Sequence, residues 1–449
     1  MSVNLSAAVS RLWRAAVASE LRRDVLETYI VRILVVVLTF ATTVVITRTL
    51  GPTGRGFYAV AATLGAIGVQ FSNLGLHASN IYYVSQDRAL LPTLIGNTLA
   101  VVFVACMLVA VGAIGFVLWP AMSPLRGSLL FLALAFVPVS LGYMLTQGLL
   151  LGVNKVRVYN RIEVGGKLLA LGLICVLALG HQGTVEVLFG ITLLSVLVSF
   201  LWALLRLRSV SAEPVALSMK LFRQCLPVGV NAYMIAFFGF LVMRIDLLMV
   251  KYMLGATEAG YYSISQVLSE NTMLLPVVIG LLLFPKLSAI RDKEAKLHLA
   301  NKAALVTAAL MLPAVVVAAF AAAPVISIAF GRNFLAAVAP FVWLLPGIYF
   351  LGIEVVLVQL LNSEGFPKII VIAWLADTIV NVGLNLWAIP LYGITGASVV
   401  SSICYFLIFV VIFAVIRKRF RVPRPAPACA SDFQPLQFEA NHPTGPDCD

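Results

Sequence analysis

Unbroken apolar runs of more than twenty residues dominate this chain and leave few folds open to it. A helix needs about 20 consecutive apolar residues to cross the hydrocarbon core of a bilayer. The composition agrees, with 61% hydrophobic and 11% charged residues and a mean hydropathy of +1.02. Soluble domains are about 25% charged, and membrane β-barrels alternate apolar and polar residues within segments of about ten. The sequence therefore predicts an all-α integral membrane protein and excludes soluble enzymes, secreted disulfide scaffolds and free nucleic-acid binders.

Twelve segments are apolar and long enough to be transmembrane helices, and the connections between them are short. We expect helices at 27–49, 57–84, 92–119, 127–151, 158–180, 184–206, 223–250, 257–284, 299–323, 335–361, 368–390 and 393–416. The expected regions are a cytoplasmic amphipathic segment 1–26, a six-helix lobe 27–206, a cytoplasmic linker 207–222, a second six-helix lobe 223–416 and a disordered cytoplasmic tail 417–449.

The distribution of basic residues predicts the orientation. Of the 31 Lys and Arg residues, 23 fall on the side that holds both termini, five on the other side and three within predicted helices. Cytoplasmic loops of membrane proteins are enriched in Lys and Arg. We therefore expect a multi-pass protein of the bacterial inner membrane with both termini in the cytoplasm. This topology accounts for most of the net charge of +12 without a nucleic-acid partner.

An internal repeat divides the chain into two halves. Residues 50–58 read LGPTGRGFY and residues 254–262 read LGATEAGYY, at equivalent places after the first and seventh predicted helices. Because six helices separate the two copies, both halves cross the membrane in the same direction. Parallel repeats of this kind surround a central substrate cavity in transporters that work by alternating access.

Polar residues inside predicted helices are candidate functional groups, because a charge at the bilayer centre costs about 2.5–3.5 kcal/mol on insertion scales. The second predicted helix carries polar residues at spacings of 3, 4 and 3, which places them on one helical face. Hydrogen bonding within the bundle is one interpretation, and a hydrated cavity that binds hydroxyl-rich groups is the other. The residues of this stripe are Gln70, Asn73, His77 and Asn80.

A second polar face lies on the fifth predicted helix and comprises Asn160, Glu163 and Lys167. Glu163 and Lys167 are four residues apart in the order that favours an ion pair. They either neutralise each other, or Lys167 binds an anionic group and Glu163 is its partner when that group is absent.

The second half carries further candidates for charge pairing or ion coupling, and no motif for catalysis. Bound H⁺ or Na⁺ is one role for the acidic residues, and hydrogen bonds between packed helices are the alternative. No P-loop, serine-hydrolase elbow or cysteine–histidine metal motif is present, so we expect no catalytic residue, no metal site and no cofactor beyond a coupling ion. The charged candidates are Arg244, Asp246, Glu270 and Asp377.

Two long segments resemble a known group of membrane proteins. ITRTLGPTGRGFYAVAATLGAIGVQFSNLGLHASNIYYVSQ is similar to the first hairpin of bacterial polysaccharide flippases, and LLNSEGFPKIIVIAWLADTIVNVGLNLWAIPLYGITGASVVSSI is similar to their last three helices. The chain thus resembles the multidrug/oligosaccharidyl-lipid/polysaccharide exporter superfamily, in its polysaccharide flippase branch. The resemblance implies a substrate that is an oligosaccharide repeat unit on a polyprenyl diphosphate, moved from the cytoplasmic to the periplasmic leaflet for surface or exopolysaccharide biosynthesis.

With that substrate, the predicted residues divide by chemistry. The stripe from Gln70 to Asn80, together with Asn160, would contact sugar hydroxyls. The apolar tail would stay among membrane lipids, and glycan polymerase machinery would be a further partner. Cationic side chains would contact the diphosphate, namely Arg32, Arg48, Arg55 and Lys167.

Three alternatives remain at this stage. A cation-coupled multidrug antiporter of the same fold would have a cavity dominated by acidic residues. A membrane glycan polymerase or ligase would show transferase activity in purified protein. A non-transporting scaffold for glycan assembly would leave export intact in its absence.

Overall fold

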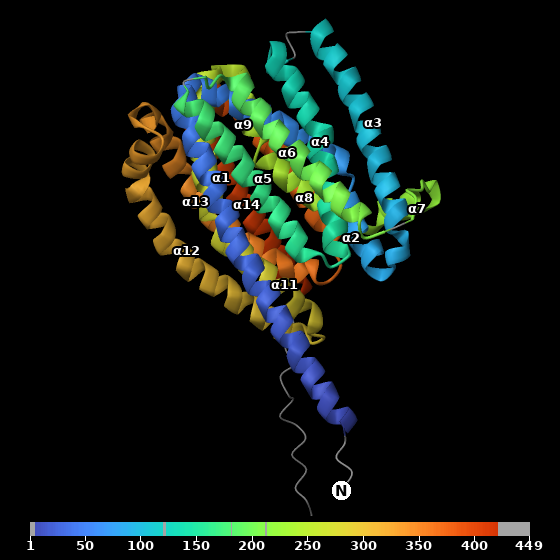
Figure 1. The fold of residues 1–449 in the computed structure, drawn as a ribbon. Helices are drawn as coiled ribbons and strands as arrows, with labels where there is room; N and C mark the ends of the chain where they lie inside the picture. Colours follow the sequence, from blue (N-terminus) through green and yellow to red (C-terminus); the bar gives the residue numbers. More distant parts are fainter. Residues whose placement is uncertain (1–4, 120–122, 181, 212, 421–449) are drawn as a thin grey trace, which may run out of the picture.

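Helices make up nearly all of the computed structural model, which describes residues 5–119, 123–180, 182–211 and 213–420 (Figure 1). Within these ranges it does not describe the side chains of residues 5–26, 28–29 and 228–229. The α-helices are α1 (Leu5–Asn73), α2 (Leu76–Gln86), α3 (Leu91–Leu118), α4 (Gly127–Gly152), α5 (Val156–Leu179), α6 (Val185–Arg208), α7 (Met219–Cys225), α8 (Val230–Val242), α9 (Ile245–Leu254), α10 (Ala256–Thr272), α11 (Leu274–Ala289), α12 (Lys293–Ala329), α13 (Val338–Asn362) and α14 (Lys368–Arg419).

In the described part of the chain, nine helical segments are long and apolar enough to cross a membrane, and the bent pair α10–α11 raises the number to ten. Two of these, Ile30–Asn73 and Lys368–Arg419, have 44 and 52 residues. At about 1.5 Å per residue each is about twice the 30 Å thickness of the hydrocarbon core. Non-helical backbone at Gly51 and Gly393 divides them into two arms each. The chain is therefore a multi-pass all-α membrane protein, and the count of twelve remains a prediction.

Three of the predicted helices are broken rather than continuous. The predicted helix 57–84 is interrupted at Leu74 and Gly75, which both have positive φ, so α1 ends and α2 begins there. The predicted helix 223–250 is divided into α7, a 3₁₀ turn, α8 and α9, and α9 continues to residue 254. The predicted helix 257–284 bends by 42° between α10 and α11. The break between α8 and α9 is accompanied by a hydrogen bond from Gln266 to the backbone oxygen of Met243.

The structure describes only part of the N-terminal and C-terminal segments predicted to lie outside the membrane. The backbone of residues 5–26 is helical and continuous with the rest of α1, and this part projects beyond the bundle (Figure 1). Its placement on the membrane surface stays a prediction, because its side chains lie outside the described residues. The predicted tail 417–449 lies outside them from residue 421 onward, while α14 continues to Arg419.

The internal repeat is visible in the backbone. Gly51 has φ 65° and ψ −177°, and Gly255, its counterpart 204 residues later, has φ 98° and ψ −177°. Only glycine adopts such dihedral angles readily. We call the end of the bundle that carries these two turns the glycine end.

The hydrophobic core differs between the two ends of the bundle. At the glycine end one cluster joins both halves, with Tyr58 and Phe189 from the first half packed with Leu247 and Tyr262 from the second. Toward the other end the halves have their own cores, one built mainly from α2 to α6 and the other from α11 to α14. The helices α3 and α12 lie at opposite edges of the bundle (Figure 1). Among the described residues the halves thus share a hydrophobic core at the glycine end, and toward the other end they touch through the Tyr233 hydroxyl, which donates to Gln70 O at 2.8 Å, and through the rings of Phe71 and Phe237, 6.0 Å apart.

The linker between the halves is fastened to α3. Asn97 exchanges two hydrogen bonds of 3.1 Å with the backbone of Ser218. A Cβ atom on Gly96 would lie 2.0 Å from the backbone oxygen of Ala216, so glycine allows this close approach. The linker is therefore held against α3 by specific backbone contacts at the end of the bundle remote from Gly51.

Candidate functional site

A charged cluster forms where α1 packs against α5 in the first half. Arg32 Nη1 donates a hydrogen bond of 3.2 Å to Glu163 Oε1, and Arg32 Nη2 donates one of 2.7 Å to the hydroxyl of Tyr159. The Arg32 guanidinium also lies 5.6 Å from the centre of the Tyr159 ring. The Arg32 side chain is 55% exposed, whereas that of Glu163 is 14% exposed. The cation is therefore accessible, and its carboxylate partner is mostly buried.

Lys167 extends this cluster by one helical turn. It is half-buried, and within the described part of the chain it forms no hydrogen bond or ion pair, although its charge interacts with Glu163. The second carboxylate oxygen of Glu163, Oε2, is buried and has no hydrogen-bond partner there. Glu163 thus pairs with Arg32 of α1, and the pair with Lys167 that the spacing suggested is not formed.

Two aromatic residues belong to the cluster although the sequence analysis did not single them out. The hydroxyl of Tyr159 accepts a hydrogen bond from Arg32 beside Glu163, and Tyr143 of α4 is hydrogen-bonded to Gln147 and interacts with Glu163. The spacing of 159 and 163 on one helix was the available signal. Asn160 is buried beside them, 2% exposed. In residue types, the cluster holds two cations, one carboxylate and several hydroxyl and amide groups.

The other two arginines predicted to bind a diphosphate lie elsewhere. Arg48 Nε donates a hydrogen bond of 2.8 Å to the backbone oxygen of Ala329, and its Nη2 donates to that of Ile328, so it caps the end of α12. Arg55 is 6% exposed and donates a hydrogen bond of 3.2 Å to Ser263 of α10. Both arginines join the two halves near the glycine end, and neither is part of the Arg32 cluster.

The polar stripe on α1 and α2 is not a single helical face, because the break at Leu74 and Gly75 separates Asn73 from His77. Three of its members bond within the protein, which favours the bundle-internal interpretation, and their contact with sugar stays a prediction. Gln70 contributes its backbone oxygen, which accepts a hydrogen bond of 2.8 Å from Tyr233. The other contacts are His77 N to Asn73 Oδ1 (3.1 Å), His77 Nδ1 to Met144 O (2.9 Å) and Asn80 Nδ2 to Thr98 Oγ1 (3.3 Å).

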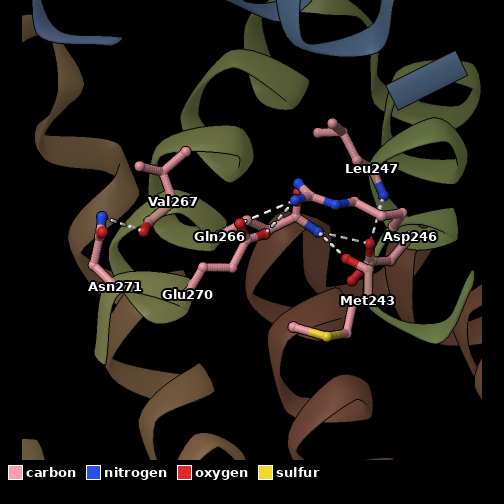
Figure 2. Close-up of polar contacts among 8 residues, drawn as sticks. Met243, Asp246, Leu247, Gln266, Val267, Glu270 and Asn271 are labelled. Carbon is pink, nitrogen blue, oxygen red and sulfur yellow. Dashed lines mark hydrogen bonds and ion pairs between the residues drawn. The ribbon is translucent and has the colours of Figure 1, made fainter. Parts of the chain in front are cut away.

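In the second half, the break between α8 and α9 separates two charges that a regular helix would hold on nearly opposite faces. Arg244 Nη2 lies 2.9 Å from the carboxylate of Glu270 on α10, and the two side chains are 27% and 34% exposed. Gln266 Nε2 donates a hydrogen bond of 3.1 Å to the backbone oxygen of Met243, which the break leaves without a helical partner. Figure 2 shows Gln266 reaching from α10 toward Met243 and Asp246, and Glu270, one turn further along α10, beside it.

Asp246 is 1% exposed and fully satisfied by hydrogen bonds. Its Oδ1 accepts from the Leu247 amide at 2.7 Å and from Gln266 Nε2 at 2.8 Å, and its Oδ2 accepts from the hydroxyls of Tyr262 at 2.5 Å and Ser401 at 3.1 Å. Four donors on one buried carboxylate hold α9, α10 and α14 together.

A second buried polar group adjoins Asp246 and is less completely paired. Asp377 is 6% exposed and hydrogen-bonded to Cys404, and the charge of Glu354 on α13 interacts with it. Cys404, which the sequence places among small apolar residues, is also bonded to Asn381. No group of three His, Cys, Asp or Glu side chains that could hold a metal occurs among the described residues. Buried atoms without a hydrogen-bond partner there are Glu354 Oε1, Asp377 Oδ2, Asn381 Nδ2 and Asn385 Oδ1.

The two copies of the repeat contact each other directly at the glycine end. Thr53 Oγ1 and Thr257 Oγ1 are 2.8 Å apart and share a hydrogen bond. A Cβ atom on Gly56 would lie 1.7 Å from the backbone oxygen of Ala256, and one on Gly260 would lie 2.0 Å from that of Pro52. The repeated Gly and Thr residues therefore allow the closest approach of the two halves.

Comparison with known proteins gives one family and one curated relative. Residues 45–339 match the family described as "Polysaccharide biosynthesis protein". Over 160 residues the chain is 27% identical to a putative O-antigen transporter of Shigella flexneri, covering 35% of this chain and 38% of that protein. The match therefore spans less than half the length of the relative.

Solved structures share the fold at low sequence identity. The lipid II flippase MurJ in an inward closed conformation has a TM-score of 0.71 at 14% identity, over 88% of each chain. A multidrug resistance MATE family transporter of the MOP superfamily in an inward-facing conformation has a TM-score of 0.69 at 14% identity, over 85% of this chain and 94% of that one. An outward-facing conformation of such a transporter has a TM-score of 0.55 at 15% identity, over 88% and 94%.

Proposed function

Because the chain belongs to the polysaccharide biosynthesis protein family and has the fold of membrane transporters rather than of enzymes, we propose that it flips a polyprenyl-diphosphate-linked oligosaccharide. The substrate moves from the cytoplasmic to the periplasmic leaflet of the bacterial inner membrane, and both termini are cytoplasmic. The product serves the assembly of surface or exported polysaccharide. The putative O-antigen transporter of Shigella flexneri supports the sugar part of this assignment.

The observation that carries the proposal is the cluster of Arg32, Glu163 and Lys167 within apolar helices. Ionisable residues in membrane helices mark substrate pathways because their burial is unfavourable without a partner. Here two cations face one carboxylate, so the cluster has a net positive charge, and Arg32 is accessible. A diphosphate is an anion that an accessible arginine binds well. The adjoining hydroxyl and amide groups suit a sugar.

Alternating access is the proposed mechanism. The halves share a hydrophobic core and close backbone contacts at the glycine end, and they have separate cores toward the other end. With cytoplasmic termini, this arrangement corresponds to a state closed toward the periplasm. Separation of the Gly56 and Gly260 contact, with approach of the halves at the other end, would then expose the substrate to the periplasmic leaflet.

Coupling to H⁺ or Na⁺ is assigned to the second half. Asp377 and Glu354 are both buried and their charges interact, and each leaves a carboxylate oxygen without a partner among the described residues. Such oxygens accept either a proton or a cation. In proteoliposomes, a pH gradient or a Na⁺ gradient should accelerate flipping, and Asp377→Asn should remove the acceleration. Transport that is indifferent to both gradients would contradict the coupling.

The main test is the fate of the lipid-linked repeat unit. Deleting the gene should cause polyprenyl-diphosphate oligosaccharide to accumulate on the inner leaflet, and purified protein in liposomes should flip it. Efflux of cationic drugs without lipid flipping would instead identify a multidrug antiporter. Glycosyl transfer by the purified protein would identify a polymerase or ligase, and normal export in the deletion strain would leave only a scaffold role.

A further inference from the structure

The Arg32 cluster contains one carboxylate, Glu163, and two cations, Arg32 and Lys167. Glu163 is paired with only one of the two cations. Glu163 uses Oε1 to bind Arg32 of α1, while its Oε2 is buried without a partner. Lys167 forms no hydrogen bond or ion pair within the described part of the chain. Glutamate and lysine four residues apart on a helix are in the geometry of an ion pair. The carboxylate therefore has a second cation within reach that it does not use.

The ion pair between Arg32 and Glu163 has the geometry of a weak one. Arg32 contacts Glu163 through a single N–O distance of 3.2 Å, whereas charge-assisted hydrogen bonds of arginine are shorter, at about 2.7–2.9 Å, and are often bidentate. Arg32 is 55% exposed, so an incoming anion can approach its guanidinium. Glu163 and Lys167 sit on the same helix, so a change of partner by Glu163 needs only side-chain rotation.

We propose that Glu163 is an exchange carboxylate that sets substrate release: it occupies Arg32 in the empty protein and moves to Lys167 when the diphosphate of the substrate binds Arg32. The inference rests on the proposed function. When the substrate reaches the other leaflet, Glu163 returns to Arg32 and displaces the diphosphate. Lys167 then acts on binding through Glu163, as a positioning residue, and does not contact the substrate.

With this exchange, the effect of Lys167 on diphosphate binding depends on the charge of Glu163. If Lys167 acts only by drawing Glu163 away from Arg32, then removing Lys167 has no effect once Glu163 has lost its charge. If Lys167 binds the diphosphate itself, its removal weakens binding whether or not Glu163 is charged. A double-mutant cycle separates these two cases.

The experiment measures binding of undecaprenyl diphosphate to the purified full-length protein in detergent, with undecaprenol as the uncharged comparison. Glu163→Gln should tighten diphosphate binding about two- to fivefold, the range expected when a partly exposed ion pair no longer competes. Lys167→Met should weaken binding by a similar factor in the natural background and leave it unchanged in the Glu163→Gln background. Undecaprenol binding should not respond to either change.

Transport gives a second readout that a merely structural role would not produce. Because release is slowed, Glu163→Gln should lower the flipping rate at saturating substrate while the half-saturating concentration falls. Glu186→Gln, an exposed acidic residue in the first turn of α6, is the matched control and should match the natural protein in both measurements. Thermal unfolding of each variant checks that the fold is retained.

The outcomes separate failure of the exchange from failure of the function. A protein that neither binds undecaprenyl diphosphate nor flips the lipid-linked oligosaccharide overturns the proposed function. If it does both, the exchange is overturned by weaker or unchanged binding in Glu163→Gln. It is equally overturned if Lys167→Met weakens binding by the same factor in both backgrounds.

Discussion

At the scale of single residues, the buried acids differ in how fully the surrounding protein satisfies them. Asp246 accepts four hydrogen bonds, so a ligand would find no free oxygen on it. Glu163, Glu354 and Asp377 each leave one oxygen without a partner among the described residues. An unsatisfied buried polar atom is unfavourable by about 1–3 kcal/mol. The four hydrogen bonds of Asp246 therefore favour a structural role, and we expect a cation or proton to act at the other three acids.

The role of Asp246 predicts a loss of stability in Asp246→Asn. The amide keeps one acceptor and turns the other into a donor, which then faces donors on Gln266 or Tyr262. We expect the free energy of unfolding to fall by about 1–3 kcal/mol, measured as a lower midpoint of thermal unfolding. Asp87→Asn is the control, because Asp87 is an exposed cap and asparagine caps equally well. An unchanged midpoint in Asp246→Asn would contradict the structural role.

The accessible cation of the Arg32 cluster predicts a loss of transport. In Arg32→Ala the proposed diphosphate would lose a cationic partner, and Glu163 loses its ion pair. We expect flipping in proteoliposomes to slow by about tenfold, which corresponds to about 1.4 kcal/mol. Arg161→Ala removes an exposed arginine from the same helix as Glu163 and should have no such effect. Natural flipping rates in Arg32→Ala would remove the cluster from the substrate pathway.

At the scale of elements, the apolar runs predict the class of protein and most of the helices, because spanning a bilayer requires long uncharged segments. The apolar runs do not show where a transmembrane helix is interrupted. The backbone leaves the helix after Val242, and Gln266, 23 residues after Met243, donates to the backbone oxygen of Met243. Similarly, Glu163 pairs with Arg32, 131 residues earlier, although the local spacing favours Lys167. Both outcomes depend on which helices pack together, and the periodicity of one helix carries no such information.

The contact between α1 and α10 predicts an unusual sensitivity to one methyl group. In Gly56→Ala the new Cβ would lie 1.7 Å from the backbone oxygen of Ala256, so the halves must move apart at the glycine end. We expect a lower unfolding midpoint and a slower flipping rate. Gly112→Ala is the matched control, because no atom lies within 4 Å of its Cβ and alanine favours helix by up to about 1 kcal/mol. Equal midpoints for the two variants would contradict the close contact.

The ion pair between α12 and the turn after α13 predicts a dependence on pH. Lys296 Nζ lies 2.5 Å from Glu364 Oε1, and this hydrogen bond, with nearby basic residues, lowers the pKa of Glu364. A lowered pKa stabilises the fold above the unfolded value of about 4.3, and the contribution is lost as the pH falls through the folded pKa. Glu364→Gln should therefore lower the unfolding midpoint at pH 7, and the difference from the natural protein should shrink as the pH falls below the unfolded pKa of about 4.3. Glu213→Gln, exposed in the linker, should have no effect across this pH range.

At the scale of the whole molecule, the two repeats are related in sequence but differ in what they contain. The first half carries the accessible Arg32 cluster, and the second half carries the buried acids around Asp246 and Asp377. Their shared core lies at the glycine end, where the repeated motifs meet. On the proposed function, substrate would bind in the first half and the coupling ion in the second, and the contact between the repeats is a structural link through which one could affect the other.

This arrangement predicts that fixing the repeats together stops transport. Thr53 and Thr257 are close enough for cysteines at both positions to form a disulfide, since their side-chain oxygens are 2.8 Å apart. Oxidised Thr53→Cys/Thr257→Cys protein should flip lipid at least about tenfold more slowly yet still bind undecaprenyl diphosphate, because the state with the glycine end closed is retained. Reduction should restore flipping, and each single variant should be indifferent to oxidation. Full transport in the cross-linked protein would show that the glycine end does not open, and alternating access between these two halves would then be wrong.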